Sequence, residues 1–155
     1  MNKSLVSARL SRDAALVGRA MVLLLSYQTP EERSHRTTTD SNRAGFSIAN
    51  AEYGTYLAHW VLGLTTSSFK SWQVSRKPSD AFIAAKVRAF LGQTYSSGRP
   101  LTGYHLQRGR EIGTYHWAQT AALLAPPPPA AKPVHIWGTD MEYMMRQHDR
   151  FQQFA

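Results

Sequence analysis

The chain has 155 residues, of which 43% are hydrophobic and 18% are charged, and its net charge is +8. This composition is typical of one globular domain with a real core and excludes a disordered polyelectrolyte. The absence of cysteine excludes a disulfide framework and a thiolate zinc site. The apolar run Ala20–Leu25 is too short to span a bilayer and lacks a signal-peptide pattern, so we expect a cytoplasmic protein without a membrane partner.

Helical periodicity dominates the first part of the chain. From Ser4 to Ser26 the apolar residues recur at the spacing of one helix face, which predicts a single long helix. The segment Thr29–Glu32 is a capping box with proline at the first helical position, and it predicts the start of a short helix. The polar stretch from Thr37 to Gly45 predicts a loop.

A glycine and a phenylalanine end this loop. Gly45 permits a turn that other residues resist, and Phe46 is predicted to anchor the loop in the core. Ser47 or Asn50 can then cap a helix that stops at Gly63, a favoured C-terminal residue.

Three further helices are predicted between residues 67 and 124. Ser67–Arg76 is a short one, and Ser79 caps the next, whose expected apolar face is Phe82, Ile83, Val87, Phe90 and Leu91. Thr102–Leu124 is the third, and it contains Gly109 and Gly113 at i,i+4. Each glycine lowers helix stability by roughly 1 kcal/mol relative to alanine, so we expect a neighbouring helix to approach closely there.

Two pairs of these helices have the short connections of a helix-turn-helix motif. They are Ser67–Arg76 with Ser79–Gln93, and Ala81–Thr94 with Gly103–Thr120. The connection Tyr95–Leu101 is long for such a turn, so a plain helical hairpin is the favoured interpretation.

The C-terminal part begins with a proline run. Residues 125–133 contain four consecutive prolines and predict an extended spacer, in preference to a ligand for a proline-binding domain. The capping box Thr139–Glu142 then opens a terminal helix that either docks on the core or binds a partner. Its candidate partner-binding residues are Met141, Tyr143, Met144 and Phe151.

Strand signals are scarce, so the predicted fold class is all-α. We expect a compact bundle of about five to six helices over residues 1–125, a proline-rich linker over 126–138 and a C-terminal helix over 139–155.

Positive charge is concentrated between Lys70 and Arg110, where eight basic side chains accompany one acid, Asp80. Lys and Arg neutralise phosphates, and the interleaved aromatic residues could stack on unpaired bases. If helix packing gathers the charges, they form a site for nucleic acid or another anion. Lys86 borders an apolar face, so Arg88, Arg99 and Arg110 are predicted to be the freest charges. The candidate residues are Lys70, Arg76, Lys77, Lys86, Arg88, Arg99, Arg108 and Arg110.

No motif of catalysis or metal binding is present. The sequence lacks HExxH, a Walker loop, GxGxxG and GxSxG, and its six histidines are dispersed. We therefore expect no cofactor and no metal. We also expect no enzymatic activity, and a hydrolase or nuclease remains an alternative only through residues that folding brings together.

Two segments carry a resemblance. The first has YQTPEE from Tyr27, Gly45-Phe46-Ser47 and Asn50-Ala51; the second runs from Leu101-Thr102 through Arg108, Arg110 and Tyr115 to Gln119. Together they resemble a short helical motif of uncharacterised phage and mobile-element proteins, also found beside helicase-type DNA-processing domains. Asn50 stands where aspartate is commoner. The resemblance implies a mobile-element origin and a nucleic-acid context, and it assigns no catalytic residue.

Two functions follow from these expectations. The first is a small basic accessory protein of phage or plasmid type, which binds nucleic acid or a nucleic-acid-processing complex. The second is an inhibitor or adaptor of anti-defence or host-takeover type, whose basic surface engages an acidic host protein.

Overall fold

The computed structural model describes residues 1–39, 44–93 and 98–125, and this part of the chain is all-α, as predicted. Residues 1–124 form one compact unit. The predicted linker and terminal helix, with the candidate residues Met141, Tyr143, Met144 and Phe151, lie outside the described residues. In chain order the elements are α1 (Lys3–Arg12), α2 (Ala14–Ser26), α3 (Pro30–His35), α4 (Ile48–Val61), α5 (Phe69–Val74), α6 (Asp80–Leu91), α7 (Gly103–Tyr115), α8 (Trp117–Thr120) and the 3-10 turn η1 (Ala121–Leu123).

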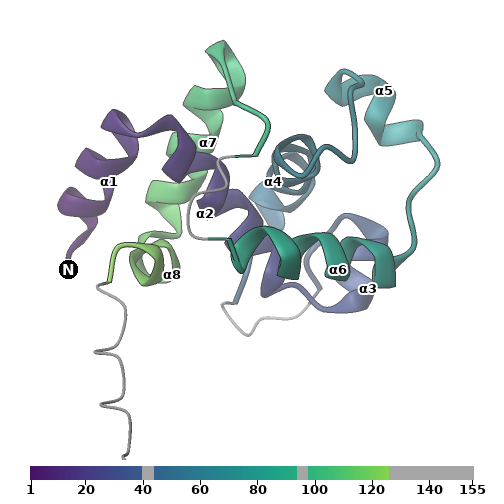
Figure 1. Cartoon of the computed structure of the whole chain (residues 1–155), viewed down its shortest axis with the longest axis horizontal. Coiled ribbons are helices and arrows are strands. Elements are labelled where there is room, and N and C mark those ends of the chain that lie inside the picture. Colours follow the sequence, from purple (N-terminus) through teal and green to yellow (C-terminus); the bar gives the residue numbers. More distant parts are fainter. Residues whose placement is uncertain (40–43, 94–97, 126–155) are drawn as a thin grey trace, which may run out of the picture. The chain divides into compact units, whose positions relative to one another are not determined.

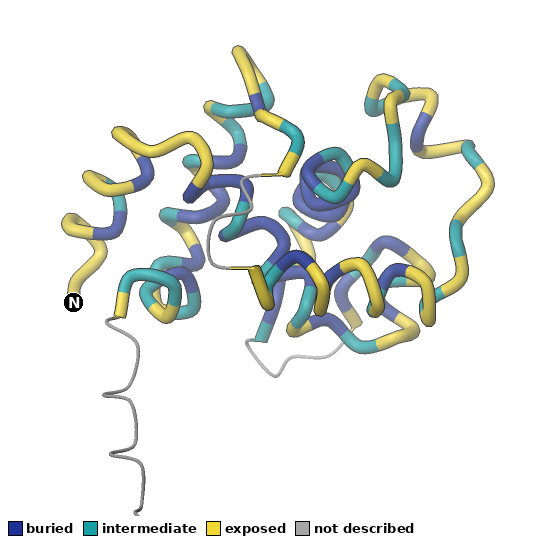
Figure 2. Tube along the Cα trace, viewed as in Figure 1, coloured by how far each residue is buried: buried dark blue, intermediate teal, exposed yellow. Residues whose placement is uncertain are grey.

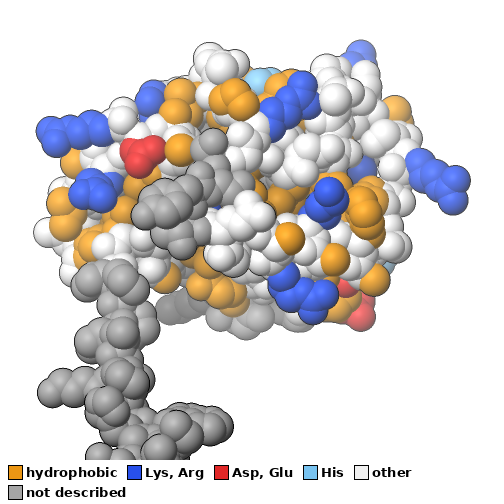
Figure 3. Space-filling model, in the orientation of Figure 1, with side chains coloured by type: hydrophobic (Ala, Val, Ile, Leu, Met, Phe, Trp, Pro, Cys, Tyr) orange, Lys and Arg blue, Asp and Glu red, His pale blue; other side chains and the backbone are white. Residues whose placement is uncertain are grey.

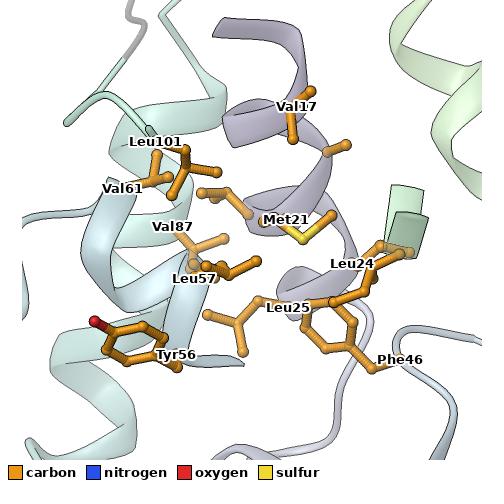
Figure 4. Close-up of a cluster of buried hydrophobic side chains, with 14 of the residues drawn as sticks. Val17, Met21, Leu24, Leu25, Phe46, Tyr56, Leu57, Val61, Val87 and Leu101 are labelled. Atoms are coloured by element: carbon orange, nitrogen blue, oxygen red, sulfur yellow. The ribbon is translucent and has the colours of Figure 1, made fainter. Parts of the chain in front are cut away.

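Helix α2 is the centre of the fold (Figure 1). It is apolar on nearly every side, so it is buried by neighbours all round: α1, α4, α6 and α7 pack against it. Figure 2 shows this buried centre and the exposed outer faces of the helices around it. In Figure 4, Met21 and Leu25 of α2 lie among Leu57 of α4, Val87 of α6 and Leu101 of the segment before α7.

The prediction of a single helix from Ser4 to Ser26 is wrong, because the helix is interrupted at Asp13. Asp13 is extended (φ −130°), and its carboxylate accepts a hydrogen bond from the backbone N–H of Leu16 at 3.0 Å. This side chain caps a new helix, so α1 and α2 are separate and pack on each other. The predicted helix Thr102–Leu124 is also interrupted, at His116.

The close helix approach predicted at the two glycines of α7 is confirmed. A Cβ at Gly109 would lie 2.7 Å from Cγ1 of Val17 on α2, and one at Gly113 would lie 2.9 Å from Cδ1 of Leu10 on α1. Both distances are shorter than van der Waals contact, so only glycine lets α7 lie this close to its neighbours.

The loop before α4 is anchored by Phe46, as predicted. Phe46 is 1% exposed and its ring lies against Gly54, where any Cβ would overlap the ring. Gly45 adopts φ +76°, the left-handed region that favours glycine. Its backbone N–H donates to Oε1 of Gln119 at 2.7 Å, and its carbonyl accepts from Nε2 of Gln119 at 3.2 Å. These hydrogen bonds join Gly45, in the first of the two segments that carry the resemblance, to Gln119 in the second.

Neither predicted helix pair forms a helix-turn-helix or a plain hairpin. In the described part of the chain α5 packs on α4, α6 packs mainly on α2 and α3, and α7 packs on α1, α2 and α4. The segment before α7 is held at the end of α4, where the backbone N–H of Arg99 donates to the carbonyl of Val61 at 2.9 Å.

Candidate nucleic-acid interface

Asp80, the one acid between Lys70 and Arg110, is neutralised by a residue from outside that segment. Arg33 of α3 donates from Nε to Oδ1 of Asp80 at 2.7 Å and from Nη2 to Oδ2 at 3.2 Å. This bidentate, partly buried pair joins α3 to the start of α6. The other charges of the segment are consequently not paired with Asp80.

Three of the predicted basic residues share one groove. Arg76 and Lys77 from the segment after α5 and Lys86 from α6 line a hollow of about 400 Å³, which we call the basic groove. Ser79 caps α6 by accepting from the N–H of Phe82 at 3.3 Å, so the helix begins directly beside the two preceding cations. The remaining lining residues are Gly63, Leu64, Pro78 and Phe82, and none is acidic.

Phe82 is not a core residue, and this corrects the sequence prediction. It is 50% exposed, and the ammonium of Lys86 lies 5.6 Å from its ring centroid. The core face of α6 consists of Ile83, Val87 and Phe90 instead. An exposed ring therefore lies in the basic groove next to a cation.

Lys70 and Arg88 are exposed but do not line this groove. Lys70 lies on α5, and Arg88 lies two residues after Lys86, about 200° further round the helix. Figure 3 shows Lys and Arg side chains over the α6 side of the molecule, separated by hydrophobic and polar side chains.

Arg99 is not the free charge that the sequence predicted. Its guanidinium lies 3.7 Å from the ring centroid of Trp60, and Nη1 donates to the carbonyl of Thr65 at 2.9 Å. Stacking on an aromatic ring leaves the outer side of the guanidinium plane available to a ligand.

Arg110 is likewise engaged within the protein, which corrects the second of the predicted free charges. It donates to the carbonyls of Leu10 and Ser11 at 3.3 and 3.2 Å, where α1 ends. A cation at this position compensates carbonyls that the helix end leaves without partners. Arg108 pairs with Glu111 at 2.6 Å.

Aromatic residues from α4 and α7 form a second feature, which we call the aromatic face: Tyr53, Trp60, Tyr104 and His105, flanked by Arg99 and Arg108. The Tyr53 hydroxyl and Nδ1 of His105 are 2.6 Å apart, and the His105 ring stacks towards Trp60 with centroids 6.3 Å apart. Burial, chiefly, raises the pKa of Tyr53 to about 12, so this phenol stays protonated at neutral pH. Sequence reasoning missed Tyr53 and Trp60, which precede the basic segment.

The sequence also did not predict a buried polar cluster beneath α5, formed by Arg36, His59 and Trp72. The guanidinium of Arg36 lies 3.7 Å from the ring centroid of Trp72 and donates to the Trp72 carbonyl. Trp72 donates from Nε1 to Nδ1 of His59 at 3.3 Å, and His59 is 1% exposed. Burial, and secondly the charge of Arg36, lower the pKa of His59 to about 4. Burial also lowers the pKa of Arg36, and the charge of Glu52 opposes this effect.

The described residues contain no group of His, Asp and Glu side chains that could hold a metal ion. None of their helices is long and apolar enough to cross a membrane. Comparison with protein-family models, curated proteins and solved structures finds no match for this chain. The function is therefore inferred from the geometry of the chain itself.

Proposed function

We propose that this protein binds nucleic acid, and that the basic groove holds the phosphates of its backbone. The observation that carries the proposal is the convergence of Arg76, Lys77 and Lys86 on a groove with no acidic lining residue. Such unopposed cations can replace the counterions of a phosphate chain, and the released counterions make binding favourable.

The surroundings of the groove support this proposal. The bond of Asp80 to Arg33 satisfies the one carboxylate that the segment carries. Lys70 and Arg88 add positive charge outside the groove, and at distances below about 10 Å such charges still attract a polyanion at physiological salt. Arg110 is excluded from the binding set because it bonds the end of α1.

The proposed protein is an accessory protein without catalysis of its own. The resemblance in Tyr27–Leu62 to phage and mobile-element proteins agrees with a nucleic-acid context. Gly45 and Phe46 of that segment, and Gln119 of the second segment of the resemblance, make structural contacts in this chain, so we assign them to the scaffold.

The test is fluorescence-anisotropy binding of labelled DNA and RNA over a salt series. Exchanging Arg76, Lys77 and Lys86 together for glutamine should weaken binding strongly. It should also reduce the slope of log affinity against log salt by roughly two to three units, because each phosphate that a cation no longer neutralises lowers the slope by about 0.7–0.9.

A matched control removes the same amount of charge elsewhere. Lys3, Arg9 and Arg12 are exposed on α1, at the other end of the molecule from α5 (Figure 1), and none of them lines the basic groove. Exchanging these three for glutamine should leave most of the affinity intact. Equal losses in the two triple variants, or no binding by the unmodified protein at low salt, would contradict the proposal.

An acidic protein partner is the second candidate. Val74 is 87% exposed on α5, close in the chain to Arg76 and Lys77, and exposed apolar side chains beside cations suit a protein interface. Pull-down from host lysate with and without nuclease treatment discriminates the two candidates. Partners that survive nuclease and are absent with the groove variant would favour the adaptor.

A further inference from the structure

Tyr104 is an exposed aromatic ring with two aromatic neighbours. It is 69% exposed at the start of α7, yet it makes edge contacts with two neighbouring rings. Its centroid lies 6.2 Å from that of Tyr53 at an interplanar angle of 81°, and 6.3 Å from that of His105 at 64°. These contacts give the ring aromatic neighbours, and its exposed fraction leaves most of the side chain open to a ligand.

Cations flank the aromatic face at Tyr53 and Trp60, without an opposing free acid among the described residues that form the face. Arg108 lies 5.6 Å from the Tyr53 centroid, and its partner Glu111 is held in an ion pair. On the other side, ring contacts lead from Tyr104 through His105 to Trp60, on which Arg99 stacks. The aromatic face is therefore a row of rings with a guanidinium group at each end.

One turn of the chain lies between the aromatic face and the basic groove and contacts both. Arg99 is bonded to the carbonyls of Val61 and Thr65, at the two ends of the turn that follows α4. Gly63 and Leu64, in the middle of the same turn, line the basic groove. A chain that lies in the groove can therefore cross this turn and reach Arg99 and the aromatic face.

We infer that the aromatic face stacks unpaired nucleobases, so that the nucleic acid bound at the basic groove is single-stranded. This inference rests on the proposed function. Proteins that bind single strands combine a positive groove for the backbone with aromatic rings for successive bases. A duplex keeps its bases stacked inside, so it can use the cations of the groove but not the faces of Tyr104.

The test compares Tyr104→Ala with a matched control on the same helix. Tyr115 is 65% exposed on α7 and lies outside the aromatic face, so Tyr115→Ala removes a ring of similar exposure. Tyr104→Phe keeps the ring and should behave like the unmodified protein. The probes are oligothymidylate and oligouridylate of about 16 nucleotides, the upper end of common site sizes, a DNA duplex of equal length, and an abasic strand with the same phosphates.

Tyr104→Ala should bind oligothymidylate about tenfold more weakly, which corresponds to the loss of one stacked base. Its affinity for the duplex and the abasic strand should be unchanged. The oligouridylate arm compares RNA with DNA, and a preference for one strand type reports on the 2′-hydroxyl together with the 5-methyl group that distinguishes thymine from uracil.

Each other result overturns the inference in a distinguishable way. Unchanged binding of oligothymidylate by Tyr104→Ala, with weaker binding by the groove variant, rejects the aromatic face and leaves phosphate binding standing. Equal losses of affinity for oligothymidylate, duplex and abasic strand reject base stacking as the cause. Absence of binding to every probe by the unmodified protein rejects the proposed function together with the inference.

Discussion

The contact between α1 and α7 and the basic groove before α6 use the same kind of residue in opposite ways. At the α1–α7 contact, Arg110 donates to two carbonyls at the end of α1, and glycines of α7 pack against α1 and α2. At the groove, Arg76, Lys77 and Lys86 form no ion pair with any described residue, and Phe82 is half exposed.

The difference shows that charge density along the chain is not the same as charge available to a ligand. A guanidinium bonded to a helix end contributes to stability, because it stabilises carbonyls that would otherwise lack partners. A cation without a protein partner contributes little to stability and remains able to meet a phosphate. The two regions should therefore respond differently to substitution and to pH.

The largest expected effect is on the α5 side, through acid titration of buried His59. Its pKa is about 4 in the folded protein and near 6.5 when unfolded, so the unfolded chain binds more protons between these values. The contribution of neutral His59 to the free energy of unfolding should be fully present above pH 6.5. It should fall by up to about 3 kcal/mol as the pH drops towards 4. Burial lowers the pKa of His116 as well, which adds a loss of the same sign.

Urea denaturation at pH 7 and pH 5 measures this loss. His59→Gln cannot titrate at this position and should reduce the pH dependence. Amide exchange should locate the acid-induced opening at α5, next to the basic groove. A pH dependence that is the same in His59→Gln and in the unmodified protein would show that this buried cluster is not its source.

The second effect concerns the tight packing of α7. Gly109→Val adds a branched side chain where even a Cβ would lie 2.7 Å from Val17, so it should destabilise the protein by about 2 kcal/mol. Ala85→Leu adds a side chain on the exposed side of α6 and should change stability by no more than about 0.5 kcal/mol. Thermal unfolding of both variants checks the contrast, and equal shifts would mean that α7 is not closely packed at Gly109.

The smallest expected effect distinguishes a cation that is bonded within the protein, Arg110, from a cation of the basic groove, Lys86. Arg110→Gln should lower stability by about 1 kcal/mol and leave nucleic-acid affinity nearly unchanged, because its hydrogen bonds are internal. Lys86→Gln should keep stability within about 0.5 kcal/mol, weaken binding severalfold and reduce the salt slope by about one unit. Denaturation and anisotropy titrations of both variants measure the contrast. A larger drop in affinity for Arg110→Gln than for Lys86→Gln would show that the two regions do not differ in this way.

The sequence predicted those features of the structure that depend on residues close together in the chain, such as helix caps. The capping box at Thr29 forms as expected, with the hydroxyl of Thr29 accepting from the N–H of Glu32 and the carboxylate of Glu32 accepting from the N–H of Thr29. The Ser79 cap and the Phe46 anchor were also predictable. Caps and turns need only groups a few residues apart, so their signals can be read along the chain. The same reading failed at Asp13, where an aspartate inside an apolar periodic pattern caps a new helix.

The sequence alone determined the all-α fold class, most of the helix starts and the segment that holds most of the net positive charge. Only the tertiary structure decided which charges are available, because their partners lie far away in the sequence. Asp80 is held by Arg33, Arg110 by carbonyls of α1, and Arg99 by Trp60 of α4. The groove of Arg76, Lys77 and Lys86 exists because α6 packs on α2 and α3 and leaves these three side chains without an acidic partner in the described part of the chain.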